Sequence, residues 1–272
     1  MSGKKQGVKD FRAHVFEVAL KWIIWMIGNC DLKACLLENV KGVLMYLNGE
    51  APYFERVLQM LRAKVPHWGW AVDTLRSADY MLPSQRERVI LRGLHKAYSP
   101  TGVPPCLPPF GTAHLRDFLC KGLPIVLSSS FTEQMQLNKT WFDAQVAEAL
   151  RSGEAGPADI CVYGLDRQAG LVYRPVWKLN VVPTLTTSNQ YLFVCIAGEV
   201  GLSDEAKTLH RWLTPGERFG LQGKSPMMAA HIVSKAKCIK GAGNSYPTSI
   251  IVAGLGPMLN KISSAGGPLT HI

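Results

Sequence analysis

The sequence is short of acidic residues and lacks the usual catalytic and metal-binding patterns. Its 272 residues include 20 Asp and Glu against 30 Lys and Arg, which leaves a net charge of +10. This excess favours a polyanionic partner, with nucleic acid ahead of an acidic membrane surface. Because 47% of the residues are hydrophobic and 18% are charged, the composition excludes wholesale disorder, a collagen-like fold and a disulfide-dense mini-protein.

The seven cysteines follow no metal-binding or disulfide pattern. Their number is odd, no CxxC pair occurs, and Cys30 and Cys35 have no nearby histidine to complete a zinc site. The seven histidines form neither HExxH nor a Ser/His/Asp pattern. We therefore expect reduced thiols, no metal site and no hydrolase site.

No apolar run is long enough to cross a membrane. The best candidate, residues 15–27, is interrupted by Glu17 and Lys21 and has no small-residue cleavage site. We expect neither a signal peptide nor a membrane partner. An intracellular location follows: the nucleus in a eukaryote, the cytoplasm or nucleoid in a prokaryotic or viral system.

The first ninety-odd residues alternate between helical and strand patterns. Apolar spacing predicts helices over residues 11–27 and 54–63, and short apolar runs predict strands over residues 33–37, 68–73 and 89–93. Alternation of this kind favours an α/β layer architecture.

The composition changes between about residues 94 and 199. A turn-rich segment at 103–111 and the short runs ICVYG, LVYRPV and YLFVCI, with no regular helix between them, predict an irregular, β-leaning insert. From Thr214, with Pro215 and Glu217 completing a helix start, the chain becomes helical again. A final helix is expected over residues 248–262, and no internal repeat is present.

Two polar motifs lie beside predicted strands. Glu38 follows the strand at 33–37, where a carboxylate in a dry pocket can act as a general acid, or can simply be a surface glutamate. Arg86 and Arg88 precede the strand at 89–93. Their planar guanidiniums suit a base carbonyl or a phosphate, although a solvated charge run is the alternative.

Two further motifs each allow a functional and a purely structural interpretation. Glycines in GAGNSYP (241–247) allow close approach to a ligand ahead of a helix, or merely form a helix-entry turn. Cys106 follows Pro105, which makes its thiol a candidate nucleophile. It lies in a proline-rich linker with no base or phosphate binder beside it, so we expect it not to be the nucleophile.

The order of five motifs resembles one family. LLENVKGVL, ADYMLPSQRERVILRG, PTLTTSN, RWLTPGERFGLQG and GNSYPTSIIVAGLGPML follow one another as in the carbon-5 cytosine-specific DNA methyltransferases, over residues 11–259. The resemblance implies an α/β fold: a partial Rossmann-like methyltransferase sheet with an inserted, irregular, β-rich target-recognition domain. It also implies transfer of a methyl group from S-adenosyl-L-methionine to carbon 5 of a flipped cytosine in duplex DNA.

The resemblance implies roles for individual residues. Glu38 matches the glutamate that contacts N3 of the flipped cytosine. Arg88 would approach the O2 side, and Arg86 would support its loop and the DNA backbone, which makes these three the catalytic set. The family's glutamine position holds Ser84, with Gln85 displaced by one.

Other matches concern DNA and the cofactor. DNA contacts are implied for Asn39, Gln85, Thr184 and Arg211, the last in the helix region that organises the target-recognition domain. That region departs from the family at Gly220, where arginine is usual, and at Lys224-Ser225, where Phe-Pro is usual. Asn244 and Ser245 match residues that complete the wall of the S-adenosyl-L-methionine pocket.

The resemblance also implies three parts. Residues 1–94 would be the C-terminal half of the catalytic domain, residues 95–205 the target-recognition domain, and residues 206–272 C-terminal helices that return to the catalytic domain. The family's Phe-x-Gly-x-Gly cofactor loop and Pro-Cys-Gln nucleophile loop are absent from the sequence. We therefore expect an incomplete cofactor pocket, no nucleophile in this chain and no stand-alone activity.

Three explanations stay open at this point. The chain could be part of a methyltransferase whose N-terminal portion was lost at a gene boundary. It could be one half of a split enzyme, with a second chain that supplies the N-terminal half. It could also be a non-catalytic, DNA-binding remnant of such an enzyme.

Overall fold

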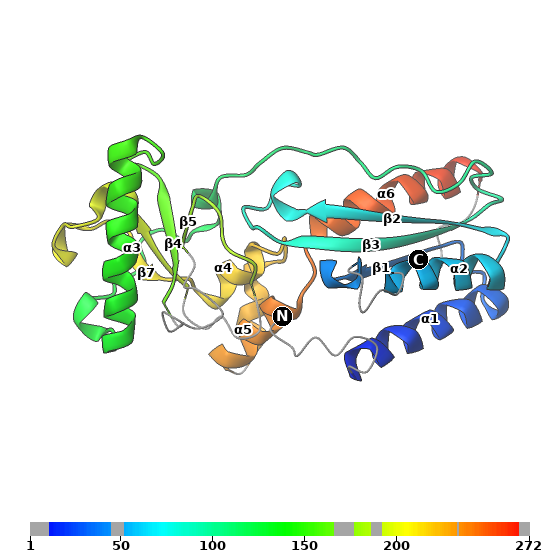
Figure 1. Cartoon of the computed structure of the whole chain (residues 1–272), viewed down its shortest axis with the longest axis horizontal. Coiled ribbons are helices and arrows are strands. Elements are labelled where there is room, and N and C mark those ends of the chain that lie inside the picture. Colours follow the sequence, from blue (N-terminus) through cyan, green and yellow to red (C-terminus); the bar gives the residue numbers. More distant parts are fainter. Residues whose placement is uncertain (1–10, 45–51, 166–176, 186–191, 233, 267–272) are drawn as a thin grey trace. The chain divides into compact units, whose positions relative to one another are not determined.

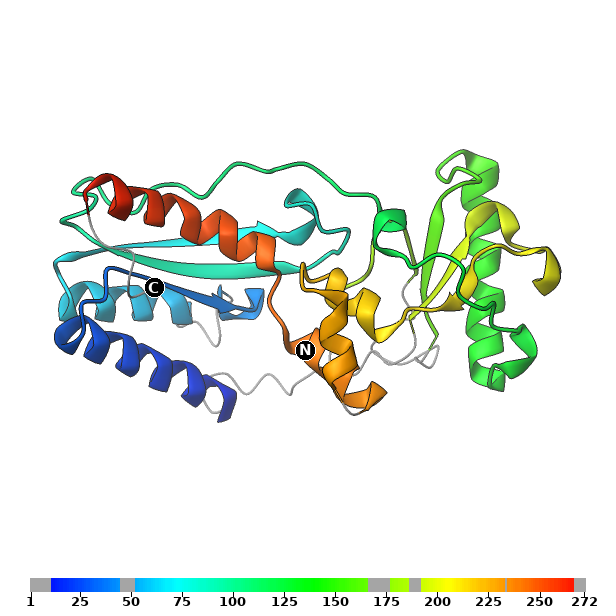
Figure 2. The ribbon, with the colours of Figure 1, turned by 180° about the vertical axis from the view of Figure 1, so that it is seen from behind.

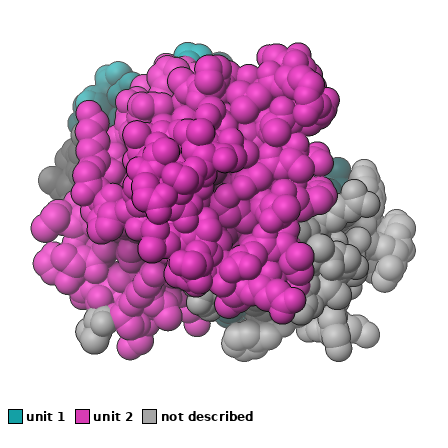
Figure 3. Space-filling model, turned by 90° about the vertical axis from the view of Figure 1, so that its left-hand side faces the viewer, with its two compact units in different colours: residues 1–76, 87–109, 250–272 teal, residues 77–86, 110–249 magenta. Residues whose placement is uncertain are grey.

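A computed structural model describes residues 11–44, 52–165, 177–185, 192–232 and 234–266 (Figure 1). The chain divides into two compact units, which Figure 3 distinguishes by colour. Unit 1 comprises residues 1–76, 87–109 and 250–272, and unit 2 comprises residues 77–86 and 110–249.

Unit 1 is built on a three-stranded sheet in the order β1-β3-β2. The strands are β1 (Ala34–Asn39), β2 (Trp68–Arg76) and β3 (Glu87–His95). Both neighbours run antiparallel to β3, so β1 and β2 run parallel to each other. β3 is almost wholly buried because it is central and covered on both faces, as its apolar sequence requires.

Helices cover both faces of this sheet (Figures 1 and 2). On one face, α1 (Phe11–Asn29) and α2 (Tyr53–Lys64) form a core with Val89 and Leu91 of β3. On the other face lies α6 (Thr248–Ser264). It approaches closely at Gly254, where an added β-carbon would lie 3.0 Å from Leu36 Cδ1.

Unit 2 contains a four-stranded antiparallel sheet in the order β5-β4-β6-β7. Its strands are β4 (Ile160–Gly164), β5 (Trp177–Leu179), β6 (Leu192–Ile196) and β7 (His210–Trp212). The helices of this unit are α3 (Glu133–Ser152), α4 (Pro215–Gly220) and α5 (Lys235–Asn244). α3 packs Phe142 and Val146 against Tyr163 and Phe193 on one face of the sheet. Short 3-10 turns span Lys41–Leu44, Ser77–Asp79, Leu115–Phe118, Ser128–Ser130, Ala197–Glu199, Asp204–Ala206 and Pro226–His231.

Most predicted elements are confirmed. The helices at 11–27, 54–63 and 248–262 correspond to α1, α2 and α6, and the three early strands correspond to β1, β2 and β3. The helix start at Thr214 is a complete capping box with Glu217 and Pro215. β1 extends to Asn39, so Glu38 lies within the strand instead of following it.

Unit 2 contains one helix that was not predicted, and one expectation for it is wrong. The helix is the 20-residue α3, which begins at the N-cap Thr132, ends at Gly153 with a φ of 78° and lies before the runs ICVYG, LVYRPV and YLFVCI. Residues 241–244 belong to the end of α5 and do not form a glycine turn, because the helix packs Cys238 and Ala242 on Phe219. The whole LVYRPV run lies outside the described residues.

The two units divide the chain differently from the three expected parts. Residues 110–249 form one compact unit together with residues 77–86, whereas residues 250–272 belong with the three-stranded sheet. The boundaries expected at residues 94 and 205 concern function and stay a prediction. The boundary between the two compact units near the C-terminus lies instead within α6.

Candidate active site

Glu38 and Arg88 form an ion pair on one face of the unit 1 sheet. Glu38 lies opposite Ile90 in the β1–β3 register, and Arg88 lies two residues before Ile90, so the two side chains are diagonal neighbours. Arg88 Nε contacts Glu38 Oε1. Burial lowers the pKa of the Arg88 guanidinium, and the charge of Glu38 opposes that shift. The pair brings together a carboxylate and a planar donor fork, and the catalytic role of both residues stays a prediction.

Asn39 continues β1 beyond this pair. Its Oδ1 accepts a hydrogen bond of 2.8 Å from the Val40 amide. The side chain therefore shapes the end of the strand, and its predicted contact with DNA stays a prediction.

A second ion pair lies on the same sheet face and was not predicted. Arg92 contacts Asp73 through Nε at 2.9 Å and through its terminal nitrogen at 2.7 Å. It also donates to the carbonyl oxygen of Pro104 at 2.6 Å. An arginine inside the apolar run VILRG was the available signal, because a charge in a buried strand needs a partner. This pair attaches the linker after β3 to the sheet.

Cys106 lies beside this second pair. Burial raises the pKa of its thiol to about 11, with Arg92 opposing the shift and Asp73 adding to it. The thiol is therefore protonated at neutral pH and is a poor nucleophile. Cys35 in β1 is similar, since burial raises its pKa to about 12. Cys30, which precedes β1, is exposed.

Arg86 is a buried tie within unit 2. Its guanidinium donates to the carbonyl oxygens of Leu185 at 2.9 Å, Gly243 at 3.2 Å and Ser245 at 2.8 Å. The residue thus joins the end of the Thr184-Leu185 segment to the end of α5. Supporting its loop was the role the resemblance implied, and these contacts fit that role.

Thr184 lies beside the loop that carries Gln85. Its Oγ1 donates to the Gln85 carbonyl oxygen at 2.7 Å, and the Gln85 amide donates to Val182 at 2.9 Å. The Gln85 side chain is exposed, whereas Ser84 is buried. Within the described part of the chain, Ser84 Oγ has no hydrogen-bond partner. The loop is therefore held by backbone bonds where the family has a glutamine.

Arg211 is occupied by Glu217. Two hydrogen bonds of 2.9 and 2.6 Å join the guanidinium to the carboxylate, and a third of 2.9 Å reaches the Cys120 carbonyl oxygen. Both side chains are buried. Burial acts to raise the pKa of Glu217, but the hydrogen bonds from Arg211 and from two backbone amides lower it overall. The pair organises the start of α4, and its geometry does not present Arg211 to a ligand.

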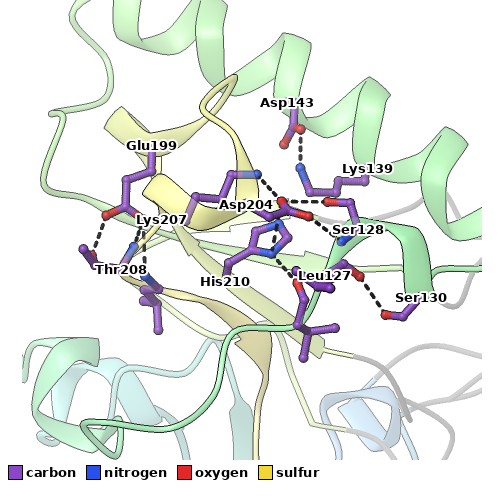
Figure 4. Close-up of polar contacts among 12 residues, drawn as sticks. Leu127, Ser128, Ser130, Lys139, Asp143, Glu199, Asp204, Lys207, Thr208 and His210 are labelled. Carbon is purple, nitrogen blue, oxygen red and sulfur yellow. Dashed lines mark hydrogen bonds and ion pairs between the residues drawn. The ribbon is translucent and has the colours of Figure 1, made fainter.

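A polar cluster in unit 2 was not foreseen from the sequence (Figure 4). Asp204 accepts bonds from the Ser128 amide at 2.7 Å, from Ser128 Oγ at 3.0 Å and from Lys207 at 2.7 Å. His210 is buried next to it, with Nδ1 2.6 Å from the Val126 carbonyl oxygen. These contacts fasten loops around β7. Among the described residues, no group of His, Cys, Asp or Glu side chains could hold a metal ion.

Comparison with known proteins decides which family has this arrangement. Residues 1–256 match the family described as C-5 cytosine-specific DNA methylase. The chain belongs to this family. A search of the curated proteins found none that matches. Within the described residues, no helix of this family member is long and apolar enough to span a bilayer.

Solved methyltransferase structures share the fold at low sequence identity. The chain is similar to Entamoeba histolytica methyltransferase EhMeth, with 14% identity, a TM-score of 0.51 and coverage of 97% of this chain and 76% of that chain. It is also similar to a DNMT2 mutant from Spodoptera frugiperda, with 16% identity, a TM-score of 0.52 and coverage of 95% of this chain and 75% of that chain. Dnmt2 from S. pombe has 15% identity and a TM-score of 0.53, and the match covers 95% of this chain and 76% of that chain. The likeness confirms the expected fold class, a Rossmann-like methyltransferase sheet with a further β-containing unit.

Proposed function

We propose that this methylase-family chain holds the target cytosine between Glu38 and Arg88. The observation that carries the proposal is the ion pair of these side chains across β1 and β3. A guanidinium can donate to the cytosine O2 while the neighbouring carboxyl group contacts N3. In its protonated form the carboxyl group donates to N3, and both contacts then draw electron density from the ring, so that a nucleophile adds at carbon 6. Carbon 5 then takes the methyl group, after which loss of the carbon-5 proton expels the nucleophile and restores the ring.

The proposed substrate is duplex DNA. A cytosine inside a duplex is inaccessible, so it must be flipped out of the stack before Glu38 and Arg88 can contact it. In this scheme residues 95–205 hold the opened duplex as a target-recognition domain. The net charge of +10 supports the scheme, since neutralising phosphates stabilises such a complex.

S-adenosyl-L-methionine supplies the methyl group when bound. Of the two residues proposed to hold it, Asn244 has an exposed side chain that suits a polar ligand. Ser245 has its polar groups engaged, since its amide donates to Gly241, its hydroxyl donates to Ala242 and its carbonyl accepts from Arg86. Ser245 therefore fixes the turn that presents Asn244.

The attacking thiolate comes from outside the residues proposed for this site. Cys106 is the cysteine that follows a proline, but its thiol is protonated at neutral pH. We therefore propose that this chain alone does not transfer methyl groups. It needs a segment with a Pro-Cys-Gln loop and a cofactor loop, which a second chain could supply.

Binding of an unpaired cytosine tests the proposal without cofactor or nucleophile. Two duplexes are compared that differ only in whether one cytosine is paired with guanine or lies opposite an abasic site. Because the unpaired base costs less to flip, we expect about tenfold tighter binding of the second duplex. Glu38→Gln and Arg88→Ala should remove that preference.

Lys41→Gln is the matched control, since Lys41 forms an exposed ion pair with Glu87 at the same end of the sheet. This variant should keep the preference. Equal binding of both duplexes by the unaltered chain, or the same preference for an unpaired thymine, would refute the proposal.

A further inference from the structure

Glu217 is the last acidic residue of the sequence, so residues 218–272 carry only basic and neutral side chains. In unit 2 this stretch forms the end of α4, the 3-10 turn Pro226–His231 and α5. A surface made from such a stretch has a positive electrostatic potential that no carboxylate side chain of the same stretch offsets.

α5 exposes three lysines on this surface. Lys235, Lys237 and Lys240 are all exposed, while Cys238 and Ala242 on the other side of the helix are buried. Within the described residues, none of the three ammonium groups forms an ion pair. We call these three residues the α5 lysines.

Other lysines of unit 2 show that pairing is available in this fold. Lys139 contacts Asp143, and Lys207 contacts Asp204 at 2.7 Å. The first pair lies within α3, and the second lies within the turn that precedes β7. The α5 lysines have no comparable structural task, so their charge is available to a partner.

The placement of these charges also lowers the stability of α5. Lys235 and Lys237 lie in its first turn, which contains no acidic residue. The N-terminal end of a helix is positive, and a cation there costs about 0.3–1 kcal/mol. A sequence that keeps two cations at that end without an acid is better explained by an anionic partner than by helix stability.

We propose that the α5 lysines bind the phosphate backbone of duplex DNA. The inference rests on the proposed function and adds DNA contacts to those predicted for Asn39, Gln85 and Thr184. Lysine is a flexible point charge without the planar fork of arginine, so it suits phosphates and not base edges. These contacts would therefore fix the duplex on unit 2 without selecting a sequence.

A charge-matched pair of variants tests this inference on the full 272-residue chain. The first variant replaces Lys235, Lys237 and Lys240 by glutamine. The second replaces Lys21, Lys64 and Lys261, which are exposed on unit 1, and removes the same net charge. Affinity for a duplex of mixed sequence is measured between about 50 and 200 mM salt, after circular dichroism has shown that both variants are folded.

We expect the first variant to bind at least about tenfold more weakly at low salt. Its plot of log affinity against log salt should be shallower by about 2.7, which is about 0.9 for each of three lost phosphate contacts. The second variant should keep a slope close to that of the unaltered chain, because its lysines belong neither to residues 95–205 nor to the α5 lysines.

The outcomes separate the inference from the function on which it rests. No DNA binding by the unaltered chain would refute the proposed function. Normal DNA binding with equal effects of the two variants would overturn the inference alone. Stronger competition by structured RNA or by anionic phospholipid vesicles than by duplex DNA, dependent on the α5 lysines, would also overturn it by identifying another partner.

Discussion

Arg86 and Arg88 are two residues apart, yet their guanidiniums bind different groups. Arg88 pairs with a carboxylate on β1, and Arg86 donates to three backbone carbonyl oxygens in unit 2. The resemblance implied a separate role for each arginine, with Arg88 at the cytosine and Arg86 supporting its loop. It could not predict the carbonyl partners of Arg86, because they come from residues 99 to 159 positions away.

Arg86→Ala should destabilise unit 2. The change leaves buried carbonyl oxygens without a donor, each at about 1–3 kcal/mol, so we expect a loss of about 3 kcal/mol in the free energy of unfolding. Arg86→Lys should recover little, since one ammonium group does not reproduce three directed bonds. Urea unfolding followed by tryptophan fluorescence measures the loss. A variant within about 0.5 kcal/mol of the unaltered chain would contradict the buried tie.

His210 should make unit 2 sensitive to acid. Burial lowers its pKa, although the Val126 carbonyl oxygen opposes that shift. The unfolded chain therefore binds a proton at a higher pH than the folded chain does. Stability from the neutral imidazole is complete above the usual histidine pKa of about 6.5 and falls as the pH drops below it.

Thermal unfolding at pH 7.5 and 5.5 measures this effect. The midpoint should be lower at pH 5.5, and His210→Gln should reduce the difference between the two pH values. His231→Gln is the control, since His231 is exposed. If the His210 variant retained the whole pH dependence, the buried imidazole would not be its source.

At the scale of elements, regular apolar spacing determined which helices could be predicted. α2 was foreseen because Phe54, Val57 and Leu61 form one buried stripe. α3 was missed because Leu137 and Trp141 are exposed and blur its stripe. Its caps were the usable signal: Thr132 at the start and Gly153 at the end, with 20 helical residues of ordinary composition between them.

α5 was missed because of its glycines. Gly241 and Gly243 each cost about 1 kcal/mol in a helix, which favours a turn in local terms. Packing against Phe219 outweighs that cost, since a β-carbon added at Gly241 would lie only 3.4 Å from the Phe219 ring. Tertiary contacts of this kind cannot be read from a single segment.

Gly93→Ala should disrupt β3. An added β-carbon would lie 2.4 Å from the Trp70 ring and 2.9 Å from Cys35 Sγ, so β1 or β2 must shift. Overpacking of this kind costs about 1–3 kcal/mol. Gly28→Ala in α1 is the control, because nothing lies within 4 Å of the added atom and alanine is the better helix former. Equal stability of the two variants in urea unfolding would contradict the close β3 packing.

For the whole molecule, the exposed apolar surface of unit 1 is the feature that most favours self-association. β1 pairs only with β3 among the described residues, and its apolar side chains lie on both faces without an edge charge other than Glu38. Trp22 and Trp25 on α1 are 60% and 53% exposed. We therefore expect the isolated chain to self-associate.

Sedimentation velocity at several protein concentrations measures that association. Replacing Trp22 and Trp25 by glutamine should reduce it, whereas replacing Leu137 and Trp141 on α3 should not, because the association is expected through unit 1. A monodisperse monomer for the unaltered chain would contradict this expectation.

The central proposal for the whole molecule is that this chain holds the target base and that another segment supplies the attacking thiolate. Transfer of labelled methyl from S-adenosyl-L-methionine to DNA tests that division most directly. The chain alone should transfer none, and a segment carrying the Pro-Cys-Gln and cofactor loops should restore transfer. Glu38→Gln should then lower the rate about a hundredfold or more, and Cys106→Ser should leave it unchanged. Transfer by the chain alone that Cys106→Ser abolishes would contradict the account.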